Sequence, residues 1–484
     1  MKKQFMVLCT FICISSCGNY FHDMGKDSSS TTSTTNAPID PPVDPPVDPP
    51  IIPPVVPPTT NSKEQFTAIY KTSVNDEVIG FVRTNDGGYC LVGNTQSGAG
   101  GYDVFLSKTD CYGNIVWQKT YGGTLDDRVY AVIKSSSGQI VFIGETYSFG
   151  KGSSDVWIVK LSQSGDIIWE KTFGGTNIDY GVGIAETGGG DFIAIANTKS
   201  FGKGKFDMWA LKISSSDGSL KWEETLGGVR DNIAYGMAKL DYSDMENYSI
   251  WGVCEDVGTG YYDGMVYSIG KDGDLNSSTM FRFGGNARCT GVSMTADEGY
   301  IVTGQVPLAG KSYDGFFITK INPDKKWGKV YSGSKNIQSC SLVRNGSTFY
   351  LSGSTNATAS NTYDFWISEF DDAGNALRHS VYGGSGSEYL KYFNSNGNGG
   401  FMIVGSSDVD GTFSNEGCII NLDSSLSAGD SSFARSDLSL TEETGLSVTV
   451  LSGTEYSASW NLNGVSAVSS SATVKTGVLE VEFK

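Results

Sequence analysis

One pattern recurs along the chain at an interval of about 52 residues, and it limits the possible folds more than any other feature. Residues 167–181 read IIWEKTFGGTNIDYG, residues 115–129 read IVWQKTYGGTLDDRV, and residues 220–234 read LKWEETLGGVRDNIA. A second marker, an acidic residue that opens an apolar segment, recurs in phase at Asp103, Asp155, Asp207, Asp263, Asp314, Asp364 and Glu416. Two markers in phase indicate seven tandem units over roughly residues 73–429.

Each unit is predicted to form four short strands. In the second unit these strands cover residues 128–134, 139–144, 155–161 and 166–173. They are rich in Val, Ile, Trp and Tyr, and Gly, Ser, Asp and Asn separate them, which is typical of hairpins. Four antiparallel strands repeated at about 50 residues are characteristic of a propeller blade. We therefore expect an all-β chain folded as a seven-bladed β-propeller.

Ring closure makes a specific prediction about the two ends of the repeat array. The seventh unit has three clear strands but no fourth, whereas FTAIYKT at residues 66–72 aligns with the fourth-strand segment IVWQKTY. We expect this N-terminal strand to complete the last blade, which places the propeller at residues 64–429. The remaining residues 430–484 lack the markers but are β-rich. They suit a small β domain, extra strands against the ring, or an eighth blade.

The N-terminus resembles a bacterial lipoprotein signal. Met1, Lys2 and Lys3 precede the apolar run FMVLCTFICI, and ISSC closes it at Cys17. This pattern predicts a signal peptide at residues 1–16 and lipidation of Cys17; the alternative is an ordinary signal peptide. Residues 17–63, rich in Ser, Thr and Pro, are expected to be a disordered tether. The chain would then be exported and anchored to a membrane by lipid, with the bacterial outer membrane as the expected location.

The repeat resembles the β-propeller repeat of exported bacterial proteins, with its glycine pair, Asp and D-apolar-W-apolar-K motif. A looser likeness, at Trp117, Trp169, Trp222 and Trp327, links it to the tryptophan-docking blades of quinoprotein dehydrogenases. From the residues themselves we expect these tryptophans to pack between adjacent blades. The Asp that opens the third strand is expected to accept backbone N–H bonds, and the glycine pair to supply positive φ at the blade junction.

Charge and composition argue against several functions. The net charge is −18 and no Lys/Arg cluster follows the N-terminus, so nucleic acid is not an expected partner. Outside the tether there is one histidine, His379, and the cysteines show no metal-ligand spacing. We therefore expect no cofactor, no metal and no enzymatic activity. We also expect the chain to be a monomer.

Any ligand is expected on the face that carries the loops between second and third strands. These loops bring aromatic and basic side chains to a rim: Phe149, Lys151, Phe201, Lys203, Tyr262, Lys311, Tyr313 and Tyr363. Aromatic residues with polar neighbours suit a glycan or a protein ligand; the alternative is that the loops only cover the blades. The sequence thus favours a tethered binding or scaffold module. A quinoprotein-like or carbohydrate-active propeller enzyme and a purely structural envelope protein are the alternatives.

Overall fold

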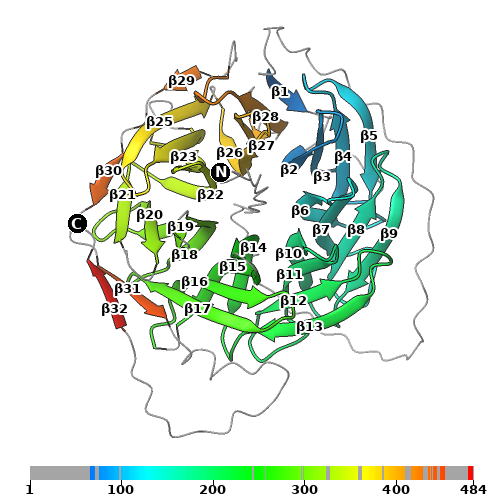
Figure 1. Ribbon diagram of the computed structural model, residues 1–484, viewed down its shortest axis with the longest axis horizontal. Helices are drawn as coiled ribbons and strands as arrows, with labels where there is room; N and C mark the ends of the chain where they lie inside the picture. The colour runs from blue at the N-terminus through cyan, green and yellow to red at the C-terminus, as the bar shows by residue number, and fades with distance from the viewer. Residues whose placement is uncertain are drawn as a thin grey trace, which may run out of the picture.

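The described part of the chain forms a closed ring of β-sheets. The structure is a computed structural model that describes residues 66–70, 76–96, 100–242, 245–256, 258–295, 297, 299–322, 327–357, 362–383, 386–408, 416–428, 434–436, 438, 440–443, 447–452 and 478–482. Seven antiparallel sheets surround a common axis (Figure 1), which confirms the seven-bladed propeller. The predicted signal peptide, Cys17 and the tether lie outside the described residues.

The strands follow one order in every blade, from the axis outward. Blades 1 to 3 contain β2 (Asp76–Arg83), β3 (Tyr89–Thr95), β4 (Asp103–Thr109), β5 (Ile115–Tyr121), β6 (Asp127–Lys134), β7 (Ile140–Thr146), β8 (Asp155–Leu161), β9 (Ile167–Phe173), β10 (Asp179–Glu186), β11 (Phe192–Thr198), β12 (Asp207–Ile213) and β13 (Leu220–Leu226). Blades 4 to 6 contain β14 (Asn232–Tyr242), β15 (Met245–Glu255), β16 (Tyr262–Gly270), β17 (Leu275–Arg282), β18 (Arg288–Met294), β19 (Tyr300–Pro307), β20 (Asp314–Ile321), β21 (Trp327–Ser332), β22 (Ile337–Asn345), β23 (Thr348–Thr355), β24 (Asp364–Phe370) and β25 (Ala376–Gly383). Blade 7 contains β26 (Glu388–Ser395), β27 (Phe401–Ser407), β28 (Glu416–Leu422) and β1 (Phe66–Tyr70).

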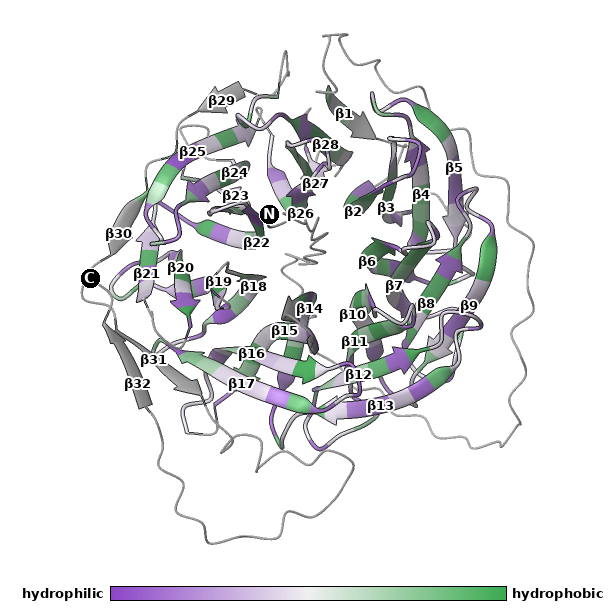
Figure 2. Ribbon diagram, in the orientation of Figure 1, coloured by the Kyte–Doolittle hydropathy of each residue, from purple (hydrophilic) through white to green (hydrophobic). Residues whose placement is uncertain are grey.

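Burial explains the apolar character of the middle strands. Every residue of β7 and β8 is buried, whereas all residues of β9 and β13 except Trp169 and Leu226 are exposed or half-buried. Figure 2 shows the same contrast, with hydrophilic residues more frequent along the outermost strands. The middle strands are covered on both faces by neighbouring blades, so they read as continuous apolar runs, while the outermost strands keep one side towards solvent.

The N-terminal strand closes the ring, as predicted. β1 pairs antiparallel with β28, with Ala68 opposite Ile419, and supplies the outermost strand of blade 7. The ring closes through the same contact that joins the other blades. Phe66 lies against Gly113 in the turn between β4 and β5, just as Trp117 lies against Gly165 one blade further on.

The C-terminal segment adds strands to three blades, and its described residues form no eighth blade. β29 (Ala434–Ser436) pairs with β25, β30 (Thr441–Glu443) with β21, and β31 (Ser447–Ser452) with β17. β32 (Val478–Glu482) pairs with β31. The segment therefore runs back along the outer edges of blades 6, 5 and 4 (Figure 1). Leu438 is buried in the core there and helps to hold the segment on the ring.

A β-bulge interrupts each innermost strand, and in blades 2 and 4 an Asn side chain from the preceding blade holds it in place. In β14 the register shifts between Ala234 and Gly236. Asn197 accepts a hydrogen bond from the Ala234 N–H (2.7 Å) and donates one to the Ala234 carbonyl (2.9 Å). Asn94 bonds to Val129 in β6 in the same way. These side chains satisfy peptide groups that the bulge removes from the ladder, and they join adjacent blades.

The expected role of the glycine pair is wrong for most units. Among the described glycines of the pairs, only Gly284 has a positive φ. A Cβ at the first glycine would instead fall on a carboxylate oxygen, and the pairs of glycine and Asp are Gly122 with Asp103, Gly174 with Asp155, Gly227 with Asp207, and Gly383 with Asp364. The glycine is needed because the buried Asp of the third strand lies against its backbone.

Positive φ is used on the opposite face, at the turn between third and fourth strands. Gly165, Gly218 and Gly374 have φ values of 77°, 73° and 75°. In each case the tryptophan of the preceding blade lies against this glycine, which has no Cβ to block it. Trp169 also donates a hydrogen bond from Nε1 to the Ser215 carbonyl (3.1 Å). The tryptophans therefore pack across blade junctions.

The lysine of the third-strand motif joins blades at the same turns. Lys160 donates to the Ser215 carbonyl of the next blade (2.8 Å), and Lys212 to the Lys271 carbonyl (3.1 Å). Lys320 contacts Asp372 of the next blade at 2.6 Å while its side chain is only 1% exposed. Asp, Trp, Lys and the glycine pair of the repeat thus all serve the joints between blades.

Candidate ligand-binding rim

The loops that are predicted to bind a ligand lie at one end of the ring axis. We call this region the inner rim: the first residues of the innermost strands, together with the connections that lead into the first and third strands of each blade. Figure 1 shows the innermost strands, β2, β6, β10, β14, β18, β22 and β26, facing the axis. Since joints account for the repeated motif, the positions that differ between units are those available for a specific function.

Two of the predicted rim residues have a packing role. Phe149 is half-buried and its ring lies 5.9 Å from that of Trp157, while Phe201 lies 4.9 Å from Trp209. Both phenylalanines also lie against the second glycine of the neighbouring pair. Phe201 remains 41% exposed. A ligand-binding role for these two residues stays a prediction, and their contacts show that they cover the blade tops.

The side chains of the loop lysines Lys151 and Lys203 are exposed, and their backbone N–H groups stabilise the loops. The Lys203 N–H donates to Asp207 Oδ2 (2.6 Å), as does the Gly204 N–H (2.8 Å). Asp155 accepts the equivalent bonds in blade 2. Asp263 differs, because it accepts a hydrogen bond from the Arg282 guanidinium (2.9 Å).

The remaining predicted rim residues lie immediately before the third strands. Lys311 is exposed, with its ammonium 5.5 Å from the ring centre of Tyr313. Tyr363 packs against Tyr389 of the next blade at 5.2 Å. Tyr262 lies between blades 3 and 4, in contact with groups that sequence reasoning did not single out. The predicted set is therefore spread around the ring and does not converge on one point.

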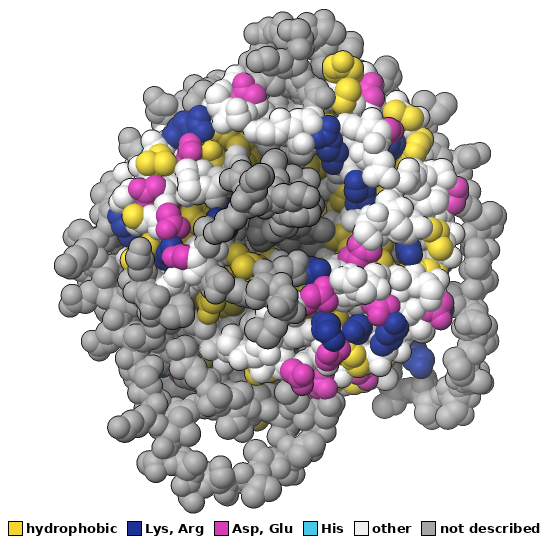
Figure 3. Space-filling model, viewed as in Figure 1, with side chains coloured by type: hydrophobic (Ala, Val, Ile, Leu, Met, Phe, Trp, Pro, Cys, Tyr) yellow, Lys and Arg dark blue, Asp and Glu magenta, His cyan; other side chains and the backbone are white. Residues whose placement is uncertain are grey.

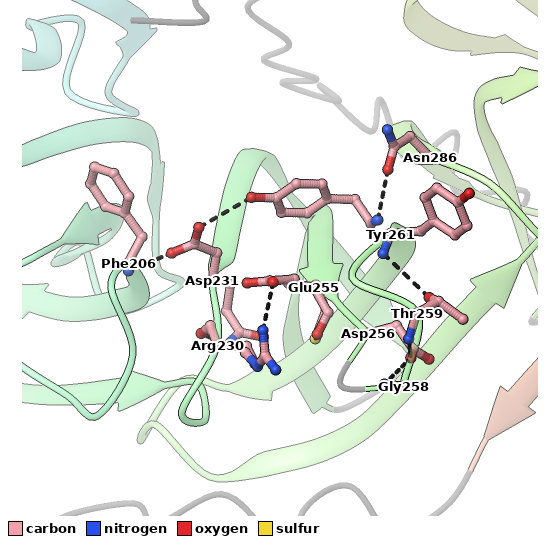
Figure 4. Close-up of polar contacts among 12 residues, drawn as sticks. Phe206, Arg230, Asp231, Glu255, Asp256, Gly258, Thr259, Tyr261 and Asn286 are labelled. Atoms are coloured by element: carbon pink, nitrogen blue, oxygen red, sulfur yellow. Dashed lines mark hydrogen bonds and ion pairs between the residues drawn. The ribbon is translucent and has the colours of Figure 1, made fainter. Parts of the chain in front are cut away.

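The best-connected part of the inner rim lies where blade 3 meets blade 4 (Figure 4). Asp231, in the connection into β14, accepts the Phe206 N–H (3.0 Å) through Oδ1 and the Tyr262 hydroxyl (3.1 Å) through Oδ2. Beside it, Arg230 forms an ion pair with Glu255 at 2.8 Å. These contacts order the side chains that surround Asp231.

Aromatic side chains continue this cluster towards blade 2. Tyr180 contacts Phe206 edge to face at 5.9 Å and Tyr130 at 6.1 Å. The Tyr130 hydroxyl donates to Glu145 Oε1 (2.6 Å). We call the four half-buried side chains Tyr130, Tyr180, Phe206 and Tyr262 the aromatic row. It crosses three blades and has a carboxylate near each end.

Charges along the aromatic row are balanced. The Lys199 ammonium lies 4.5 Å from the ring centre of Phe206, and Arg230 is paired with Glu255. Burial raises the pKa of the Tyr262 hydroxyl, and the Asp231 carboxylate raises it further, so the group remains a hydrogen-bond donor at neutral pH. On the face seen in Figure 3, Lys and Arg side chains likewise lie among Asp and Glu side chains rather than in a patch of one sign.

Sequence reasoning missed most of the aromatic row. The available signal was an aromatic residue immediately before the repeated Asp, which occurs at Tyr102, Phe206, Tyr262, Tyr313 and Tyr363. The predicted rim includes Tyr262, Tyr313 and Tyr363 at this position, but for the loop before Asp207 it names the tip residues Phe201 and Lys203 and omits Phe206. Tyr130 and Tyr180 were hidden because they lie on strands that read as ordinary core segments.

Other chemical features give no site in the described residues. No group of three or more His, Cys, Asp or Glu side chains there is arranged to hold a metal ion. His379 lies on the outermost strand of blade 6, where its Nδ1 is 2.8 Å from the Ser368 hydroxyl. Within the same residues, no helix has the length and hydropathy to cross a bilayer. Cys90, Cys289 and Cys418 are buried thiols, and burial raises the pKa of each.

Comparison with known proteins adds little to this geometry. No protein-family model matches the chain, and no curated protein matches its sequence. Among solved structures, the chain is similar to a protein of unknown function from Bacteroides caccae (11% identity, TM-score 0.33, 63% of this chain and 93% of that one). It is also similar to the α-L-arabinofuranosidase Arb93A from Fusarium graminearum (11%, 0.37, 60% and 91%). A third is the Synechocystis apocarotenoid oxygenase (10%, 0.41, 81% and 95%). Likeness at this level identifies neither a family nor an activity.

Proposed function

We propose that this protein is an exported, lipid-anchored binding module whose propeller holds a ligand at the inner rim. The observation that carries the proposal is that different residues of each unit join the blades and form the inner rim. The repeated Asp, Trp, Lys and glycine residues join the blades, whereas aromatic and charged side chains of the inner rim form one connected surface across blades 2 to 4. A rigid ring that presents varied side chains suits recognition.

The anchor belongs to the same proposal and rests on the sequence. A lipidated Cys17 followed by a Ser-, Thr- and Pro-rich segment would hold the propeller at a distance from the membrane. In that arrangement the inner rim meets ligands outside the membrane, and the protein acts as a monomer without a cofactor.

Binding to immobilised ligands tests the proposal. The mature full-length protein is applied to an array of purified saccharides and peptides, together with Tyr180→Ala and Phe206→Ala. The control is Tyr112→Ala, because Tyr112 is a 55% exposed aromatic residue in the turn between β4 and β5, at the other end of the strands. Melting temperatures measured in parallel show that each variant is folded.

The wild type and the Tyr112→Ala variant should retain the same ligands, and the two rim variants should lose them. A ligand that all four proteins retain equally would show that binding occurs elsewhere. Loss only in Tyr112→Ala would place the binding surface on the opposite face and refute the proposal.

A further inference from the structure

We infer that the ligand of the inner rim is a neutral saccharide, bound along the aromatic row. This inference rests on the proposed function and adds the chemical class of the ligand. It follows from three properties of the row: half-buried aromatic rings, hydrogen-bond acceptors, and balanced charge.

The aromatic rings provide stacking surfaces at regular intervals. Tyr130, Tyr180 and Phe206 follow one another at centroid distances of 6.1 and 5.9 Å, and each ring is half-buried. A ring face carries a partial negative charge, so it attracts weakly polarised C–H groups. One face of a pyranose ring is a flat surface of such C–H groups. The ring planes are inclined at 57° and 77° to one another, so a saccharide chain that contacts successive rings turns between them.

The polar atoms beside the rings are mostly hydrogen-bond acceptors. Asp231 Oδ1 accepts a hydrogen bond from the Phe206 N–H and Oδ2 accepts one from the Tyr262 hydroxyl, and a carboxylate oxygen can accept a second. The Tyr262 oxygen donates its proton to Asp231 and keeps its own lone pairs. A ligand that matches these atoms must supply donors, and sugar hydroxyl groups do so.

Charge makes an anionic ligand unsuitable. The cations next to the row already have partners, since Arg230 pairs with Glu255 and Lys199 lies over the Phe206 ring. The chain as a whole carries a formal charge of −18, which repels anions over the distance at which charges steer association. A neutral saccharide leaves the Arg230–Glu255 ion pair intact, and on Phe206 it uses the part of the ring that Lys199 does not cover.

Titration calorimetry tests the inference with defined ligands. The mature full-length protein is titrated with cellohexaose, xylohexaose and mannohexaose, and with an acidic oligogalacturonate of similar length. The variants are Phe206→Ala, Phe206→Trp and Tyr262→Phe, with Tyr112→Ala as the control on the opposite face. Tyr262→Phe removes one hydroxyl and keeps the ring, and Phe206→Trp keeps an aromatic surface.

At least one neutral hexaose should bind, and the oligogalacturonate should bind at least tenfold more weakly. Phe206→Ala should raise the Kd at least tenfold, Tyr262→Phe should raise it about threefold, and Phe206→Trp and Tyr112→Ala should leave it within threefold. Lack of binding by all three neutral sugars at millimolar concentration would overturn the inference, as would equal affinity of wild type and Phe206→Ala.

The two proposals fail separately. If an arrayed peptide binds and the rim variants abolish that binding, while no saccharide binds, the inner rim is a binding site for protein and only the present inference is wrong. If the rim variants change the binding of nothing, the proposed function fails together with it.

Discussion

At the scale of single residues, the contacts between blades explain why the same side chains recur in successive units. The third-strand Asp is buried, one of its oxygens accepts loop N–H groups in blades 2 and 3, and the other lies against the first glycine of the pair. The first-strand Asp completes the junction: Asp179 accepts the Gly175 N–H (2.8 Å) and the Ser200 hydroxyl (2.6 Å). The two acidic residues and the glycine therefore stabilise the same junction between blades.

Adjacent glycines offer a direct test of this explanation. A Cβ at Gly227 would overlap Asp207 Oδ1, whereas a Cβ at Gly228 has no heavy atom within 4 Å, and neither residue has a positive φ. We expect Gly227→Ala to lower the free energy of unfolding by about 1–3 kcal/mol, and Gly228→Ala to change it by less than about 0.5 kcal/mol. Urea titration of both variants measures this. Equal losses would show that backbone conformation, and not contact with the carboxylate, selects glycine here.

The same carboxylates predict a pH dependence. Burial raises the pKa of the Asp155 carboxyl above its ordinary value, and the nearby Asp179 charge acts in the same direction. Between the unfolded and the folded pKa the native state holds more protons, so this group makes the protein less stable as pH rises through that window. Asp155→Asn should therefore gain stability relative to wild type as the pH increases from about 4 towards 7. A stability difference that does not change with pH would contradict the assignment.

At the scale of elements, ring closure depends on a strand from the far end of the propeller sequence. β1 covers the edge of β28, and Phe66 lies against Gly113 in blade 1. Deletion of residues 64–72 should expose the edges of blades 1 and 7 and lower the melting temperature by several degrees or more. Deletion of residues 18–60 is the control and should leave the melting temperature unchanged. Unaltered melting and monomeric behaviour after the first deletion would show that β1 is not needed for closure.

The sequence predicted the elements well wherever a local pattern determined them. Strands of the second unit were expected at 155–161 and 166–173 and are observed as β8, Asp155–Leu161, and β9, Ile167–Phe173. The path of residues 434–452 was not predictable, because their pairing with β25, β21 and β17 is set by which edges are open and not by any motif in the segment. The glycine pair was misread for a similar reason, since its contact partner lies about 20 residues earlier in the chain.

At the scale of the whole molecule, the proposed lipid anchor and spacer would hold a rigid ring whose inner rim is polar and aromatic. Alanine at Cys17 should move the protein from the membrane fraction to the soluble fraction and abolish incorporation of labelled fatty acid. Fractionation and labelling of the expressing cells measure this. Unchanged labelling and membrane association in Cys17→Ala would refute the lipid anchor.

The central claim is that a ligand contacts the inner rim at the aromatic row. A crystal structure of the mature protein with a neutral hexaose bound tests this claim most directly. Our account predicts sugar density against Tyr180, Phe206 and Tyr262, with a hydroxyl group within hydrogen-bond distance of Asp231. Density for the sugar only on the opposite face, near Tyr112, or on the outer strands would contradict it.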